Sequence, residues 1–232
     1  MKLALIGYGA MGQLVASLAR ARGDEIGATF TSREAAETAD DLATALRGHD
    51  AAIDFSVGIA VPRNAEACAR AGVPLVEGTT GWKEKETEVR HTIAEHDGAL
   101  VYGANFSIGV NVFYRLVSQA AKLMASLDQY EAFIEEQHHS RKRDAPSGTA
   151  LKLRELMAQD IKVDVPIAAT RAGHIPGTHR VGFDSAADQI TLTHTARSRE
   201  GFAAGSLLAA RWIVGRKGVY EFGVVIDELM GP

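Results

Sequence analysis

The densest group of side chains that could transfer protons or bind anions lies in residues 136–149, which read EQHHSRKRDAPSGT. Two adjacent imidazoles, His138 and His139, are followed there by three cationic side chains at positions 141–143. A histidine can donate a proton near neutral pH, and clustered cations attract anionic groups. We therefore expect this stretch to form one wall of a pocket for an anionic molecule. A basic surface without chemistry is the alternative.

The last residues of this stretch have the composition of a helix start. Pro146 suits an early helical position, and Gly148 leaves the backbone amides uncovered. Either Ser147 or Thr149 could supply the cap. Because a helix N-terminus favours negative charge, a second anion-binding feature would lie beside the cations. The two features together predict a substrate with one or two carboxylates, and a helix cap with no further role is the alternative.

The same stretch could also be interpreted as a metal site. Zinc sites usually take several ligands at close spacing, often including cysteine, and the single cysteine, Cys68, lies far away in the sequence. A histidine and carboxylate site that uses His174 or His179 is the remaining alternative. We expect no metal.

The composition favours a small solute as the partner. The 232 residues include 25 basic and 29 acidic side chains, and this net charge of −4 argues against a nucleic acid or a membrane surface. The single cysteine excludes an internal disulfide, and no run approaches the roughly 18 apolar residues of a spanning helix. We expect a soluble, cytoplasmic protein.

The first half of the chain alternates short apolar strands with helices. The expected strands are residues 3–6, 25–30, 51–56, 74–77 and 99–102. Such alternation predicts an α/β fold with a Rossmann-type, doubly wound parallel sheet, whose ligand crevice lies at the carboxyl ends of the strands.

A glycine-rich turn, Gly7-Tyr8-Gly9-Ala10-Met11-Gly12, directly follows the first strand and predicts a dinucleotide site. Gly7 would allow the tight turn, Gly9 would let the backbone approach a pyrophosphate, and Gly12 would let the next helix lie close to the sheet. Free amides at the start of that helix would face the phosphates. The alternative is an ordinary tight turn that binds nothing.

The residues after the second strand bear on the choice of cofactor. A site that prefers NAD usually places an acidic residue there to bind the ribose 2′-hydroxyl, but this sequence has Thr31-Ser32-Arg33. Two hydroxyls beside an arginine suit a 2′-phosphate, which favours NADPH over NADH. In the alternative interpretation, Arg33 only starts a solvated helix.

The second half of the chain abandons the regular alternation. We expect helices at 110–127, 150–159 and 201–214, and strands at 130–136, 167–171, 180–184 and 189–196. The last of these alternates polar and apolar residues, as is typical of an antiparallel sheet. A final strand at 218–225 is expected to return to the first domain. We therefore expect a dinucleotide-binding domain at 1–106, joined by 209–232, and a second α+β domain with a mixed or antiparallel sheet at 107–208, for substrate binding and oligomerisation.

Several motifs together resemble the 4-hydroxy-tetrahydrodipicolinate reductase (dihydrodipicolinate reductase) family. The most specific of them is the block from His138 to Ala150. The others are the glycine-rich turn, Asp54-Phe55-Ser56, Gly78-Thr79-Thr80-Gly81, the segment 104–111 and Arg171-Ala172-Gly173. The resemblance spans nearly the whole chain.

The resemblance implies NADPH- or NADH-dependent reduction of a cyclic imine dicarboxylate to tetrahydrodipicolinate, in a homotetramer built from the sheets of the second domain. It implies that His138 donates a proton with Lys142 as its catalytic partner. His139, Ser147, Gly148 and Thr149 would bind the substrate carboxylates. The implied cofactor contacts are Gly7, Tyr8, Gly9, Ala10, Met11, Gly12, Gly78, Thr79, Thr80, Gly103, Ala104, Asn105 and Phe106. The expected cofactor site also includes Phe55 and, from their own chemistry, Thr31, Ser32 and Arg33.

The sequence departs from the family at two places. Thr31 stands where many members have an acidic residue, and the segment between Gln159 and Arg171 is short. Two other functions remain open: an amino-acid dehydrogenase for a substrate such as aspartate, and a nucleotide-sensing protein without catalysis. If the chain is the reductase, the nicotinamide comes from the first domain, and the site is complete only when the domains close.

Overall fold

The computed structural model describes residues 1–31 and 38–231, which form two compact units. The first unit contains Met1–Ile108 and Arg199–Pro232, and the second contains Gly109–Ser198.

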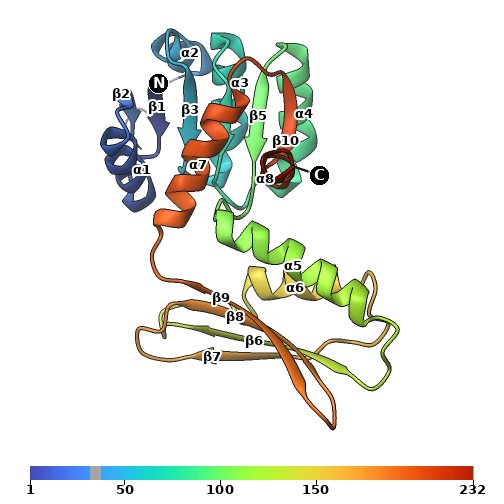
Figure 1. Cartoon of the computed structure of the whole chain (residues 1–232). Helices are drawn as coiled ribbons and strands as arrows, with labels where there is room; N and C mark the ends of the chain where they lie inside the picture. The colour runs from blue at the N-terminus through green and yellow to red at the C-terminus, as the bar shows by residue number, and fades with distance from the viewer. Residues whose placement is uncertain (32–37, 232) are drawn as a thin grey trace. The chain divides into compact units, whose positions relative to one another are not determined.

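The first unit contains a six-stranded parallel sheet in the order β10-β5-β4-β3-β1-β2 (Figure 1). Its strands are β1 (Lys2–Ile6), β2 (Glu25–Phe30), β3 (Ala51–Asp54), β4 (Leu75–Glu77), β5 (Ala99–Tyr102) and β10 (Gly218–Glu221). Its helices are α1 (Ala10–Ala21), α2 (Ala39–Leu46), α3 (Val61–Ala71), α4 (Glu86–Glu95), α7 (Glu200–Ile213) and α8 (Phe222–Met230), with short 3-10 turns η2 (Gly58–Ala60) and η3 (Lys83–Lys85). The predicted doubly wound parallel sheet is therefore confirmed.

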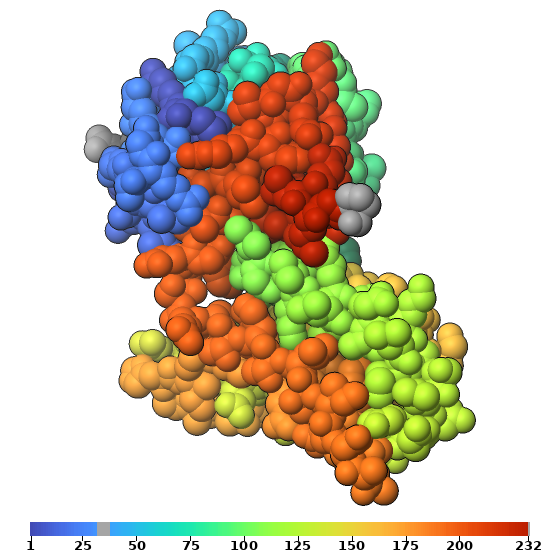
Figure 2. Space-filling model, in the orientation of Figure 1, coloured from blue at the N-terminus to red at the C-terminus, as the bar shows by residue number. Residues whose placement is uncertain are grey.

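Helices cover both faces of this sheet. On one face, α2, α3 and α4 pack over a core that includes Ala4, Ala52 and Leu75 from the strands. On the other face, α7 packs against α1 and against β3, β4 and β5. Figure 2 shows α7 and the C-terminal residues as a continuous orange-to-red surface beside the blue residues of α1.

Helix α7 belongs to the first unit as a whole, although we expected the second domain to extend to residue 208. The small residues of α7 allow a close approach: an added Cβ at Gly205 would overlap the backbone carbonyl of Phe106. The division of the chain therefore falls before this helix, between Ser198 and Arg199, and not within it.

The last part of the chain differs from the predicted strand at 218–225. Strand β10 ends at Glu221, and helix α8 begins at Phe222. Phe222, Val225 and Ile226 are buried at helical spacing, so the apolar run 222–226 forms a helix face and not the second half of a strand.

The second unit places two helices on a four-stranded mixed sheet in the order β7-β6-β8-β9 (Figure 1). Its elements are α5 (Ile108–Met124), which begins at the last residue of the first unit, β6 (Glu131–His138), α6 (Gly148–Met157), β7 (Ile167–Arg171), β8 (Gly177–Asp184) and β9 (Gln189–Ala196). Strand β6 pairs parallel to β7 and antiparallel to β8, and β8 pairs antiparallel to β9. The predicted mixed sheet is confirmed, but β8 begins three residues before the expected start, so the polar turn is shorter.

The core of the second unit joins its two helices to the sheet. Phe113 and Val117 of α5 and Leu153 of α6 pack with Ile134 and Val181. Among the helices that the structure describes, none has the length and hydropathy needed to cross a membrane.

Candidate active site

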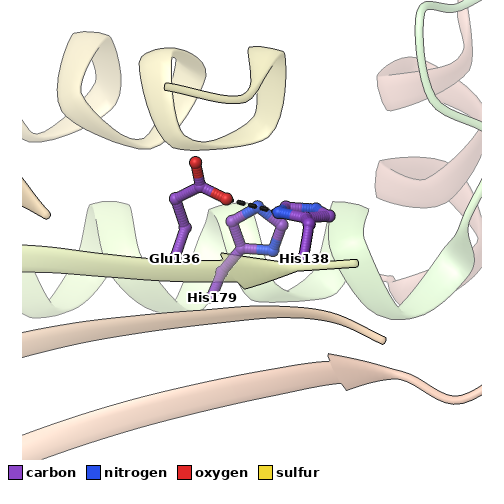
Figure 3. A group of neighbouring side chains, drawn as sticks. All are labelled: Glu136, His138 and His179. Atoms are coloured by element: carbon purple, nitrogen blue, oxygen red, sulfur yellow. Dashed lines mark hydrogen bonds and ion pairs between the residues drawn. The ribbon is translucent and has the colours of Figure 1, made fainter. Parts of the chain in front are cut away.

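The candidate active site of the second unit begins on one face of strand β6. Along this strand Ala132, Ile134, Glu136 and His138 are buried, whereas their neighbours are more exposed. The first two belong to the apolar core, and the last two continue the same face beyond it. A carboxylate and an imidazole are thus positioned side by side by the two-residue period of a strand (Figure 3).

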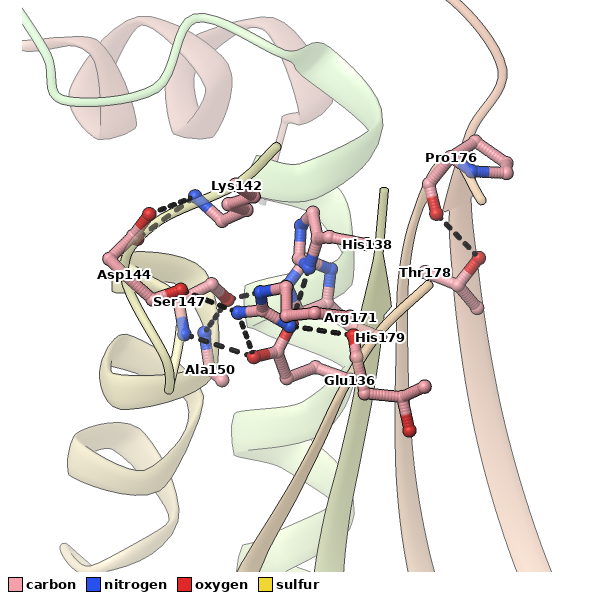
Figure 4. A network of polar contacts seen from close by, with 11 residues as sticks. Glu136, His138, Lys142, Asp144, Ser147, Ala150, Arg171, Pro176, Thr178 and His179 are labelled. Carbon is pink, nitrogen blue, oxygen red and sulfur yellow. Dashed lines mark hydrogen bonds and ion pairs between the residues drawn. The ribbon is translucent and has the colours of Figure 1, made fainter. Parts of the chain in front are cut away.

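Glu136 is the centre of the polar network (Figure 4). Its Oε2 is bound to Nδ1 of His138. Its Oε1 accepts from Nη2 of Arg171 at 2.6 Å and from the backbone N–H of Ser147 at 3.2 Å. Because Ser147 lies directly before α6 and Arg171 ends β7, one carboxylate connects three elements.

His179 of β8 lies beside His138, with ring centroids 5.1 Å apart and planes nearly perpendicular. Its Nε2 is 3.0 Å from the hydroxyl of Ser147. Its Nδ1 has no hydrogen-bond partner in the part of the chain that the structure describes. Burial, with the nearby charge of His138, lowers the pKa of His179 to about 4, so this ring is neutral near pH 7.

The protonation of Glu136 and His138 follows from opposing effects. Burial alone would raise the pKa of Glu136, but hydrogen bonds from Arg171 and His138 outweigh it and hold this pKa below the ordinary value. Burial lowers the pKa of His138, and the carboxylate of Glu136 opposes that shift. The charges of Lys142 and Arg171 lower it further. The result is an ionised carboxylate beside an imidazole whose charge depends on it.

One group of described residues could hold a metal ion, because its ligand atoms lie within 4.8 Å of one another. It consists of Glu136, His138 and His179. His179 was one of the two histidines in the metal alternative, and His174 is not in the group. The carboxylate, however, is already bound by Arg171 and His138, so a cation would have to displace both. The contacts favour a hydrogen-bonded network.

Lys142 lies in the loop after β6, and its ammonium is bound to both carboxylate oxygens of Asp144 at 2.8 and 2.9 Å (Figure 4). Its side chain is 25% exposed, and it is near enough for its charge to lower the pKa of His138. His139 is half-buried, and among the described residues its Nδ1 has no partner. The loop thus supplies an ammonium paired with Asp144 and an imidazole whose buried Nδ1 lacks a partner among the described residues.

The N-terminus of α6 has the geometry of an anion site. Ser147 is the cap, and its hydroxyl accepts from the N–H of Ala150 at 3.2 Å. Gly148 is exposed, and a Cβ added there would meet only open space. The half-buried Thr149 interacts with Tyr114, whose pKa burial raises. The predicted helix start is confirmed beside the imidazole network, and its first amides have partners within the chain: the N–H of Gly148 donates to the carboxylate of Asp144, and that of Ala150 to the cap hydroxyl.

The first unit brings most of the predicted cofactor residues to one edge of its sheet. The turns after β1, β3, β4 and β5 lie at the carboxyl ends of neighbouring parallel strands. Gly9 precedes α1 without a side-chain cap, and a Cβ there would meet only open space. Gly7 has a φ of +84°, which favours glycine. This cradle of exposed amides fits a dinucleotide pyrophosphate.

The remaining predicted cofactor residues that the structure describes lie at this edge and differ in exposure. The ring of Phe55 packs against Gly78, where a Cβ would overlap it, and Phe106 is buried against Phe55 and Phe222. Thr31 is exposed at the end of β2, whereas Ser32 and Arg33 lie outside the described residues. The other residues of this set are Tyr8, Ala10, Met11, Thr79, Thr80, Gly103, Ala104 and Asn105.

Two buried carboxyl groups, Asp54 and Glu77, support the turns after β3 and β4. They lie opposite each other in the strand register, and both are 0% exposed. Asp54 accepts from the N–H of Ser56 at 2.7 Å, and Glu77 from that of Thr79 at 2.7 Å. Burial raises the pKa of both, and the charge of Asp54 adds to the shift of Glu77. We predicted no role for this pair.

Replacing Gly12 with Ala is expected to weaken cofactor binding strongly. The added Cβ would overlap the backbone carbonyl of Gly7, so the turn or the helix start must move. Overpacking of this kind costs about 1–3 kcal/mol, which corresponds to a Kd for NADPH raised roughly 5- to 150-fold if all of it opposes binding. Calorimetric titration with NADPH measures this change, and an unchanged Kd would contradict the assignment of the turn.

Comparisons with known proteins agree with this architecture. The family model described as "Dihydrodipicolinate reductase, N-terminus" matches residues 1–106, and the one described as "Dihydrodipicolinate reductase, C-terminus" matches residues 109–226. A 4-hydroxy-tetrahydrodipicolinate reductase of Christiangramia forsetii is 37% identical over 99% of both chains. One from Anaeromyxobacter sp. is 40% identical over 81% of this chain and 76% of its own.

A solved structure shows the same fold. The dipicolinate-bound dihydrodipicolinate reductase of Paenisporosarcina sp. TG-14 matches with a TM-score of 0.79 and 20% identity, over 95% of this chain and 97% of its own. A probable dehydrogenase from Thermotoga maritima matches with a TM-score of 0.59 and 10% identity, over 97% of this chain and 93% of its own. Both likenesses concern the fold.

Proposed function

Because the chain belongs to the dihydrodipicolinate reductase family, we propose that it reduces 4-hydroxy-tetrahydrodipicolinate to tetrahydrodipicolinate with NADPH or NADH, in lysine and diaminopimelate biosynthesis. The observation that carries this function is the network in which His138 and the N-terminus of α6 share the carboxylate of Glu136. A potential proton donor thus lies next to a potential carboxylate site, as a cyclic imine dicarboxylate requires.

His138 is the proposed proton donor, and Lys142 is its proposed catalytic partner. When bound, the nicotinamide cofactor supplies the hydride. Reduction of a conjugated imine shifts negative charge towards the nitrogen and the adjacent carbon. The ammonium of Lys142 stabilises that charge, and His138 quenches it with a proton.

The substrate carboxylates are the proposed ligands of His139, Ser147, Gly148 and Thr149. Amides at the start of α6 can donate to carboxylate oxygens once the substrate replaces Asp144 as the partner of Gly148, and the resemblance to the reductase family supports His139 as a further ligand. Two held carboxylates fix the orientation of a flat ring, which removes the entropy of alignment from the reaction barrier.

The dinucleotide is proposed to bind along the carboxyl edge of the parallel sheet. The turn 7–12 receives the pyrophosphate, and the turns 78–80 and 103–106, with Phe55, contact the remaining parts of the cofactor. The uncapped α1 and the open space at Gly9 support this assignment.

A steady-state assay tests the proposed function. Purified protein should oxidise NADPH or NADH, followed by the loss of near-ultraviolet absorbance, when freshly generated 4-hydroxy-tetrahydrodipicolinate is added. Turnover of aspartate without turnover of the imine would instead identify an amino-acid dehydrogenase. Tight cofactor binding without turnover of any dicarboxylate would identify a sensing protein.

NADPH is expected to support a kcat/KM at least as high as that of NADH. The reason is the sequence Thr31-Ser32-Arg33, which lacks an acidic residue that would repel a 2′-phosphate. Replacing Arg33 with Ala should raise the KM for NADPH and leave that for NADH nearly unchanged, because only NADPH has the phosphate. A strong preference for NADH that Arg33→Ala does not alter would contradict this assignment.

The proposed assembly is a homotetramer formed through the sheet of the second unit. The proposed location is the cytoplasm. The resemblance to the reductase family supports the assembly, and the expected small, soluble substrate and cofactor support the location. Light scattering coupled to size-exclusion chromatography measures the mass in solution, and a monomeric mass at assay concentrations would refute the tetramer.

A further inference from the structure

We propose that Glu136 is a positioning residue of this reaction, which holds the ring of His138 in one orientation and connects it to the helix that grips the substrate. This inference rests on the proposed function. Glu136 is 1% exposed and uses both of its carboxylate oxygens within the network.

The contact between Glu136 and His138 determines which ring nitrogen faces the pocket. An ionised carboxylate can only accept, so Nδ1 of His138 must donate to Oε2 of Glu136. The other nitrogen, Nε2, is then the end that can exchange a proton. Gly177 lies beside that end, where a Cβ would come within 3.0 Å of Nε2, so a larger residue at this position would crowd it.

Donation from Nδ1 determines the form in which His138 can act as an acid. In the neutral ring, Nε2 has a lone pair and no proton, so His138 can act as an acid only as an imidazolium. Burial opposes that charge, and so do the two cations that face the ring, Lys142 on the loop and Arg171 on β7. His179 on β8 faces it as a neutral ring. Glu136 on β6 favours the imidazolium through both its hydrogen bond and its charge, so the imidazolium depends on it.

Glu136 also connects proton delivery to the substrate-binding elements. Its Oε1 accepts from the N–H of Ser147, the cap of α6. The same oxygen is bound by Arg171, whose Nη2 also donates to the backbone carbonyl of Asp144 at 2.6 Å. The helix start is therefore fixed relative to the ring through Glu136, and the loop that carries Lys142 through Glu136 and Arg171.

The variants Glu136→Gln and Glu136→Asp separate positioning from a merely structural role. In Glu136→Gln a single oxygen must serve three donors, and a neutral amide replaces the charge. We expect kcat to fall about 10²-fold, at the low end of general acid catalysis, with a smaller change in the KM for the imine. Because loss of the carboxylate lowers the pKa of His138 further, the fall in rate with rising pH should begin at lower pH.

Glu136→Asp keeps the charge at a shorter reach, so it should restore part of kcat and a pH profile close to that of the wild type. The matched control is Glu135→Gln, whose side chain is 43% exposed on the opposite face of β6 and pairs with Arg180. It should leave kcat and the pH profile unchanged. If Glu136→Gln and Glu136→Asp lose the same rate with an unshifted pH profile, Glu136 has a structural role only and the inference is wrong.

A measurement independent of activity separates this inference from the proposed function. Nitrogen-15 NMR of the histidine rings should show a proton on Nδ1 of neutral His138 in the wild type, and loss of this preference in Glu136→Gln. If the wild type does not reduce the imine, the proposed function fails. The spectrum still reports whether Glu136 holds the proton on Nδ1 of His138. An Nε2-protonated ring in the wild type would overturn the inference.

Discussion

Replacing His138 with Gln is expected to lower kcat for the imine by roughly 10²- to 10⁴-fold, the usual contribution of a positioned general acid. The amide of Gln can still donate to Glu136, so the buried carboxylate keeps a partner and the fold is retained. The variant therefore removes the titratable proton with little change in packing, and the KM for NADPH should stay near the wild-type value.

The matched control for this prediction is His91→Gln. His91 lies on α4 in the first unit, and its side chain is 80% exposed, so the substitution should not change kcat. Steady-state rates of the two variants and the wild type, measured at saturating NADPH, give the comparison. A His138→Gln enzyme with wild-type kcat would exclude His138 as the proton donor.

Replacing Lys142 with Met is expected to lower kcat by roughly 10²- to 10³-fold, the effect of removing one group that stabilises charge in a transition state. The ammonium is held by Asp144 and acts on the charge of His138, so it is fixed in place before any substrate binds. Met has a similar length and keeps most of the apolar contacts of the lysine stem. The loss should therefore reflect the missing charge.

Lys152→Met is the matched control for Lys142. Lys152 lies on α6, pairs with Glu155 and has a side chain that is 45% exposed. Its substitution should leave kcat unchanged, since surface ion pairs contribute little. If Lys142→Met and Lys152→Met are equally active, the loop cation has no catalytic role.

The parallel sheet could be predicted from the sequence because its signals are local. Leu3–Ile6 is a short apolar run that meets a glycine turn and a helical period within a few residues, and the structure buries all four residues of the run. The C-terminal helix could not be predicted in this way. The run 218–225 is apolar enough for a strand. The buried spacing that indicates a helix, Phe222, Val225 and Ile226, becomes visible only when residue 226 is included.

The candidate site was predictable only where its residues are contiguous. His138, Lys142 and Ser147 come from one stretch, so their types alone indicated an acid, a cation and a cap. Arg171 and His179 come from β7 and β8, and only the sheet pairing brings them to the network. Glu136 had a signal that was missed: it lies two residues before His138 on an alternating strand, which places both on one face.

The cofactor edge shows the same limit. The glycines of the turn 7–12 could be assigned from their spacing, but the buried pair of Asp54 and Glu77 could not. These two carboxyl groups end separate strands, and only the order of strands in the sheet makes them neighbours. A polar residue at the end of a buried strand was their one sequence signal.

Transfer of deuterium from labelled cofactor to product tests the central claim most directly. Wild-type protein is incubated with freshly generated 4-hydroxy-tetrahydrodipicolinate and NADPH deuterated on the transferred position of the nicotinamide, and the product is identified by mass spectrometry. The proposed function predicts tetrahydrodipicolinate carrying a single deuterium, formed in proportion to the cofactor oxidised. Cofactor oxidation without deuterated tetrahydrodipicolinate, or no oxidation at all, would contradict it.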